Sequence, residues 1–150
     1  MIWIVALIAL IIIGNFIWLL PPRSERRRMK LRNKAIMSGL TCREIKDKDL
    51  LPEAADYEQG PWLEYSIVSL TEDDDPTIVL EKSANNHWPE NNAVSSVILS
   101  KLPHSAVRVT FRTGCIAVLW NEDGELEDVQ SITDFLVSIA VTEAKPQPQT

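Results

Sequence analysis

The chain opens with nineteen consecutive residues, Ile2 to Leu20, in which Asn15 is the only polar side chain. At about 1.5 Å per residue, a helix of this run is roughly 28 Å long, close to the hydrocarbon core of a bilayer at about 30 Å. Trp3 and Trp18 stand near its two ends, where indole rings favour the membrane–water interfaces. The run therefore predicts a transmembrane helix over residues 1–21.

A cleaved signal peptide is the alternative interpretation of this run. It requires positive residues before the apolar core and a small-residue cleavage site after it, and neither is visible. The positive residues instead follow the run: Arg23, Arg26, Arg27, Arg28, Lys30, Arg32 and Lys34. Because Lys and Arg concentrate on the cytoplasmic side of a span, we expect an uncleaved anchor with Met1 outside and the C-terminal 130 residues in the cytoplasm.

Asn15 has two interpretations. Its side chain can hydrogen-bond to a partner helix for roughly 1 kcal/mol, and Ala6, Ala9 and Gly14 permit the close approach that this needs. Alternatively, Asn15 lies near the headgroups and is hydrated there. It is a candidate partner-binding residue on the first interpretation only.

Charge is divided unevenly along the chain. Residues 1–48 contain ten Lys and Arg against three Asp and Glu, a net charge of +7. Residues 49–150 contain five against eighteen, a net charge of −13. The overall charge of −6 therefore hides a basic neck joined to an acidic domain.

Residues 22–39 are predicted to form a basic juxtamembrane helix, since Pro22 suits a first helical position and Gly39 a C-terminal stop. Five basic side chains share one face of it: Arg23, Arg26, Arg27, Lys30 and Lys34. With Arg28, they are candidate contacts for anionic lipid headgroups. A contact with RNA or the ribosome is an alternative, but no aromatic residue interleaves the basic ones, so nucleic acid is less favoured. We favour a topology signal that is solvated or faces lipid.

Residues 40–142 have the pattern of a small α+β domain. Alternating or β-rich segments predict short strands over Thr41–Ile45, Trp62–Leu70, Thr77–Lys82, Val107–Arg112 and Ile116–Trp120. The third strand is expected to pair with the second across an acidic loop, and the last two to form a hairpin across Thr113 and Gly114. Val107 is expected to share the buried face of its strand with Val109 and Phe111.

Apolar residues at helical spacing predict two helices after these strands. One covers 92–102, and the other closes the domain with Val129, Ile132, Leu136 and Ile139 on its buried face. Glu122 belongs to an acidic turn ahead of this last helix. We therefore expect a mainly antiparallel sheet covered by two helices, followed by a disordered tail over 143–150.

The sequence contains no catalytic, cofactor-binding or metal-binding motif. Cys42 and Cys115 are predicted to be free thiols in a reducing cytoplasm, with Cys115 in the core. His87 and His104 share no metal-ligand spacing with each other or with a cysteine. The acidic run Glu72–Asp75 lacks the alternation of a calcium loop and is expected to be solvated. No cofactor is therefore predicted.

Aromatic residues are the remaining candidates, because they dominate both binding hot spots and small cores. We expect Tyr65 and Trp120 in the core. Trp88, in an Asn-rich loop, is the candidate for an exposed partner-binding anchor.

The neck resembles that of small uncharacterised single-pass inner-membrane proteins of proteobacteria, in the segment Leu19-Leu20-Pro21-Pro22-Arg23-Ser24-Glu25-Arg26-Arg27-Arg28 that leads to Gly39-Leu40. Leu102-Pro103, Trp120-Asn121-Glu122 and the closing helix are similar too. Some of these proteins are labelled YajC-like accessory subunits of the preprotein translocase. The resemblance implies an architecture of span, basic neck and small cytoplasmic domain, and it carries no functional residue.

These observations favour a non-enzymatic single-pass protein of the bacterial inner membrane. Its cytoplasmic domain would bind a protein partner, either a component of a membrane complex such as the translocase or a second copy of the chain. A membrane-tethered enzyme is the alternative, with a site assembled from Cys42, His87, His104 and the acidic loops. A contact between the neck and RNA or the ribosome is a third hypothesis.

Overall fold

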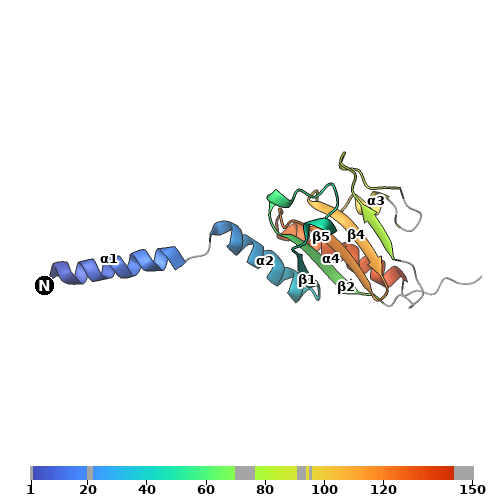
Figure 1. Cartoon of the computed structure of the whole chain (residues 1–150). Helices are drawn as coiled ribbons and strands as arrows, with labels where there is room; N and C mark the ends of the chain where they lie inside the picture. Colours follow the sequence, from blue (N-terminus) through green and yellow to red (C-terminus); the bar gives the residue numbers. More distant parts are fainter. Residues whose placement is uncertain (1, 20–21, 70–76, 91–93, 95, 144–150) are drawn as a thin grey trace, which may run out of the picture.

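The computed structural model describes residues 2–19, 22–69, 77–90, 94 and 96–143 (Figure 1). In chain order its elements are α1 (Ile2–Leu19), α2 (Arg23–Met37), β1 (Thr41–Ile45), the short 3-10 helices Lys48–Leu50 and Tyr57–Gln59, β2 (Trp62–Val68), β3 (Ile78–Glu81), α3 (Ser96–Leu99), β4 (Ala106–Arg112), β5 (Cys115–Trp120) and α4 (Leu126–Glu143). The acidic run Glu72–Asp75 and the segment 144–150 lie outside the described residues.

The five strands form one antiparallel sheet in the order β1-β2-β5-β4-β3. This confirms the predicted α+β class. The β4–β5 hairpin turns at Thr113 and Gly114, where Gly114 has a φ of 71°, a left-handed conformation that favours glycine.

The predicted partner of the third strand is wrong. β3 pairs with β4, with Leu80 opposite Val109, and not with β2, whose neighbours are β1 and β5. Alternation of apolar residues shows which face of a strand is buried, but it does not identify the neighbouring strand.

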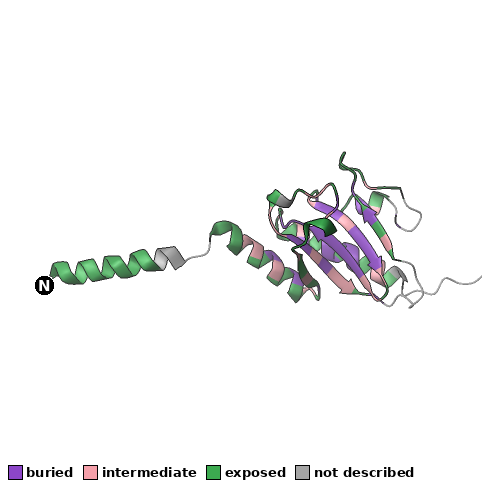
Figure 2. Cartoon of the chain, viewed as in Figure 1, coloured by how far each residue is buried: buried purple, intermediate pink, exposed green. Residues whose placement is uncertain are grey.

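The core lies between one face of the sheet and the helices α2 and α4. In Figure 2 the buried residues are concentrated on the strands of the sheet. A row of buried side chains crosses four strands on this face: Tyr65, Val118, Val109 and Leu80. From α4, Val129, Ile132 and Leu136 pack onto it. Tyr65 and Trp120 are each 0 % exposed, with ring centroids 5.3 Å apart in an edge-to-face arrangement, so the prediction that both belong to the core is confirmed.

The neck helix α2 also covers the sheet, beside α4. Of the helix expected over 92–102, the structure describes the four residues of α3, while residues 92, 93 and 95 lie outside the described residues. Val94, Leu99 and Leu102 are buried in the core, whereas Val97 is 67 % exposed. In α2, Leu31 and Ala35 are 1 % and 0 % exposed and belong to the core. The neck helix is therefore part of the packed body of the domain.

A β-bulge between Ala106 and Arg108 changes the face on which Val107 lies. Val107 packs with Trp62 and Leu119 in a small cluster separate from the main core, whereas Val109 and Phe111 belong to that core. The prediction that these three residues share one buried face is therefore wrong for Val107, because the extra residue of the bulge shifts the alternation of side chains along β4.

α1 lies apart from the sheet in Figure 1, and its side chains from Ile2 to Asn15 are all exposed. Over the described residues, no helix combines the length and the apolar character that crossing a membrane requires. The transmembrane helix therefore stays a prediction from the sequence.

Candidate functional site

The face of the sheet opposite α2 and α4 carries the residues that alternate with the core positions. Strand register places one row across all five strands: Arg43, Glu64, Leu119, Arg108 and Glu81. Leu119 is buried under the loop that follows β1, and the other four alternate in sign across the sheet. This uncovered side of the sheet, with the row at its centre, is called the open face below.

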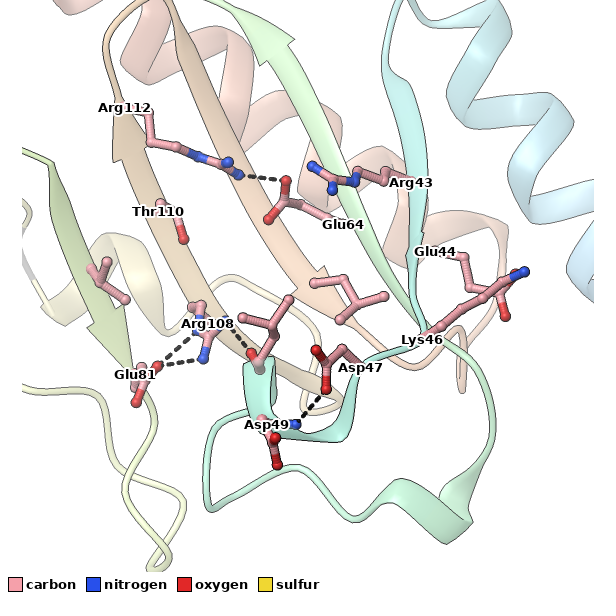
Figure 3. Close-up of a pocket in the computed structure, with 13 residues that line it drawn as sticks. Arg43, Glu44, Lys46, Asp47, Asp49, Glu64, Glu81, Arg108, Thr110 and Arg112 are labelled. Carbon is pink, nitrogen blue, oxygen red and sulfur yellow. Dashed lines mark hydrogen bonds and ion pairs between the residues drawn. The ribbon is translucent and has the colours of Figure 1, made fainter.

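A shallow groove of about 670 Å³ runs over the open face (Figure 3). Its charged lining consists of Arg43, Lys46, Arg108 and Arg112 against Glu44, Asp47, Asp49, Glu64 and Glu81. Both signs are thus present in nearly equal number, although residues 49–150 as a whole carry −13. The positive and negative charges of the groove therefore nearly cancel, although the domain as a whole is acidic.

Two ion pairs hold the arginines of β4 in place across the open face. Arg108 contacts the carboxylate of Glu81 at 2.7 Å and donates a second bond, also 2.7 Å, to the Leu50 carbonyl oxygen. Arg112 contacts Glu64 at 2.5 Å, and Figure 3 shows Arg43 pointing toward the same carboxylate from β1. Because these charged groups are fixed by one another, their arrangement on the open face is preorganised.

The loop between β1 and β2 closes one end of the groove. Leu51, Ala54 and Ala55 pack onto the cluster around Trp62, and the Trp62 indole donates to the Asp56 carbonyl oxygen at 2.9 Å. The bond from Arg108 to Leu50 pins the same loop to β4. The groove therefore has a rigid wall at this end.

A second arrangement, on the covered face, joins the neck helix to the domain. The guanidinium of Arg32 makes three contacts of 2.8 to 3.1 Å with the two carboxylate oxygens of Glu122, whose side chain is 0 % exposed. The Tyr65 hydroxyl donates to the same carboxylate at 2.8 Å. Glu122 has a φ of 56°, which is uncommon for a residue with a side chain. We call Arg32, Glu122 and Tyr65 the junction triad.

The contacts of the junction triad shift the pKa values of Arg32, Tyr65 and the nearby Cys42. The hydrogen bond to Glu122 raises the pKa of Arg32, so its guanidinium stays charged. Burial, reinforced by the Glu122 charge, raises the pKa of Tyr65 and keeps its hydroxyl a donor. The same two causes raise the pKa of the Cys42 thiol to about 11. Arg32 therefore remains a cation, while the Tyr65 hydroxyl and the Cys42 thiol remain neutral.

Two further neck arginines face the domain. Arg27 contacts Asp123 at 3.3 Å, an exposed pair worth little on its own. Arg28 is half-buried over Gly60, where a Cβ atom would lie 2.6 Å from Nη2 of Arg28. The basic side chains that remain exposed are Arg23, Arg26, Lys30 and Lys34. Two members of the predicted lipid-facing set, Arg27 and Arg28, thus also contact the acidic domain.

The predicted interface residues Trp3 and Trp18 and the predicted partner-binding residues Asn15 and Trp88 are dispersed. Trp3 is 86 % exposed and Asn15 is exposed, both on α1, while the side chain of Trp18 lies outside the described residues. Trp88 is half-buried against the core, with Nζ of Lys82 5.3 Å from its ring centroid. Its indole is therefore only partly available as a surface anchor.

His87 and His104 line one pocket of about 500 Å³ together with Trp88, and Cys42 does not line it. Nζ of Lys82 donates to the His104 carbonyl oxygen at 2.8 Å, and the amide of Asn86 contacts the His104 ring. Cys42 and Cys115 are free thiols. Cys115 is half-buried and not in the core, since its register with Arg112 places it on the open face.

Sequence reasoning missed the junction triad and recovered part of the open face. Arg32 and Glu122 are 90 positions apart, and no local pattern links them. The alternation of Arg108 and Arg112 with apolar residues, by contrast, indicates that both arginines point away from the core. Predicting which carboxylates pair with these arginines would have required knowing the order of the strands in the sheet.

Comparison with protein-family models, with curated proteins and with solved structures gives no match for this chain. The open face, the junction triad and the basic side chains of the neck are therefore the features that bear on function.

Proposed function

We propose that this protein is a non-enzymatic, single-pass protein of the bacterial inner membrane whose cytoplasmic domain binds a protein partner on the open face. In this proposal α1 is the anchor, and the neck orients the domain toward the cytoplasm. The uncovered, charge-lined groove is the observation that carries the proposal.

The anchor is supported by the sequence of the first segment, in which Asn15 is the only polar side chain between Ile2 and Leu20. The described side chains of α1, from Ile2 to Asn15, are exposed. A helix that is apolar all round needs a core or a bilayer around it. The exposed basic side chains of α2 begin four residues after Leu19, where they favour the cytoplasmic side and contact anionic headgroups.

The groove favours an extended polypeptide segment that carries charges of both signs. A strongly acidic or basic partner would meet repulsion from half of the lining, because cations and carboxylates alternate there. Glu64 and Glu81 in the central row disfavour a nucleic acid for the same reason. The resemblance of the neck to YajC-like accessory subunits makes a component of the preprotein translocase the most concrete form of this partner.

Site-specific photocrosslinking of the full chain in native membranes tests the proposal. The crosslinking residue replaces Val79, which lines the groove and is 48 % exposed, or Gln130, exposed on α4, as the matched control. We expect a discrete crosslinked protein band from position 79 only, and mass spectrometry to identify it as a translocase component. A band of two copies would favour self-association instead. No band from position 79, or equal bands from both positions, would refute binding at the groove.

A further inference from the structure

A basic pocket lies between the first two turns of α2 and the start of α4. It has a volume of about 360 Å³, and its cations are Arg23, Arg26, Arg27 and Lys30. Their spacing places them on neighbouring turns of one side of the helix. Glu125 is the only acidic residue in the lining, so the pocket is strongly cationic within an acidic domain.

The pocket also has an apolar wall. Leu31, buried in the core, and Leu126, 45 % exposed, contribute it from the two helices. A soluble phosphate would gain nothing from such a wall, whereas the glycerol and upper acyl region of a phospholipid would. The combination of cations and leucines therefore selects an amphipathic anion.

One cation of the pocket has unused hydrogen-bonding capacity. Arg27 uses Nη2 for Asp123, but its Nε is shielded from solvent and has no hydrogen-bond partner among the described residues. Polar atoms in this situation favour an acceptor from outside the chain. A phosphate oxygen is a suitable acceptor, because guanidinium and phosphate form short charge-assisted bonds.

We propose that this pocket binds the phosphate of an anionic phospholipid headgroup as a discrete site, in addition to any diffuse attraction between the neck and the membrane. The inference rests on the proposed membrane location. The pocket begins at Arg23, four residues after Leu19, and four residues span at most about 14 Å. The cations are therefore within reach of the headgroup layer next to α1.

Native mass spectrometry of the full chain in detergent micelles tests the site. The probes are dihexanoyl phosphatidylglycerol, dihexanoyl phosphatidylcholine and glycerol 3-phosphate, which has the phosphate without acyl chains. We expect one phosphatidylglycerol molecule to be retained much more strongly than either of the other probes. The variant R26Q/K30Q should weaken retention by about fivefold for each cation removed. The variant K48Q/K101Q removes the same charge at exposed positions outside both the pocket and the groove and should have no effect.

Three results would overturn the proposal. Equal losses in the two variants would mean that only overall charge matters, and equal retention of phosphatidylcholine would mean that the phosphate charge is not recognised. Retention of glycerol 3-phosphate as strong as that of the lipid would assign the pocket to a free phosphate. Because the measurement is made in micelles, it does not depend on a protein partner at the groove. A failed crosslink with intact lipid retention would refute the proposed function alone.

Discussion

At the scale of single residues, Glu122 connects the neck to the sheet. Its carboxylate is fully buried and receives both Arg32 and Tyr65, so its charge is balanced inside the domain. Removing one partner of such a pair leaves an uncompensated buried charge, which is more costly than removing both.

We expect Arg32→Gln to lower the free energy of unfolding by about 3 kcal/mol, the low end for a broken buried pair, because Arg32 is partly exposed. The double variant R32Q/E122Q should be more stable than R32Q, since an amide replaces the uncompensated carboxylate. Urea unfolding of the full chain in micelles, followed by tryptophan fluorescence, measures both. If R32Q/E122Q is no more stable than R32Q, the charges of Arg32 and Glu122 are not energetically coupled.

Cys42 supplies a prediction on pH. Burial raises the pKa of its thiol from 9.0 to about 11, so the folded state favours the neutral thiol. The resulting stabilisation is complete below pH 9.0, the unfolded value, and is lost as the pH rises through about 11. In a Cys115→Ser variant, the rate of alkylation by iodoacetamide should rise with pH, with a midpoint near the folded pKa of about 11. A midpoint near pH 9.0 would contradict the burial of this thiol.

At the scale of elements, α2 has the most distinctive role. It covers the sheet beside α4 through Leu31 and Ala35 and is joined to the loop before α4 by Arg32. The helix predicted from its basic residues to be a juxtamembrane neck thus also completes the core.

Leu31→Ala is expected to lower the free energy of unfolding by about 3 kcal/mol, as for other buried leucines. Met29 is the matched control, because it lies on the same helix and is 57 % exposed. Met29→Ala should change stability by no more than about 0.5 kcal/mol. Urea unfolding compares the two variants. Equal, small effects would mean that α2 does not contribute to the core in solution.

Much of this element pattern can be predicted from the sequence. The bounds expected for β1 are those observed, and the β4–β5 hairpin and the closing helix are at the expected places. These segments carry their own signals: regular alternation, a Thr-Gly turn and helical spacing of apolar residues.

The remaining features depend on contacts between distant segments. The pairing of β3 with β4, the bulge at Val107 and the contact of Arg32 with Glu122 leave no local trace. The buried side of α2 is also hard to identify from the sequence: Met29 and Ile36 are exposed, while Leu31 and Ala35 are buried. On so basic a helix, arginines border the buried stripe and obscure the pattern.

At the scale of the whole molecule, the separation of charge has two uses. Arg27 and Arg32 are paired with Asp123 and Glu122, so part of the neck's charge holds the acidic domain. The exposed basic side chains of α2 remain to orient the proposed anchor.

A C-terminal epitope tag tests this orientation. We expect protease to remove the tag in inside-out membrane vesicles and to leave it intact in spheroplasts. The variant R23Q/R26Q/K30Q/K34Q removes exposed charges only and should give a mixture of orientations, because the positive-inside signal is weakened. Removal of the tag in spheroplasts of the unmodified protein would refute the cytoplasmic location of the domain.

The docking of α2 against the core also fixes the orientation of the groove. Since the helix and the sheet are one packed body, the groove keeps a constant orientation relative to the axis of α2. In the proposed function, the domain would not turn about the neck to search for a better fit. An encounter with the proposed partner would then succeed or fail with the rotation of the whole chain.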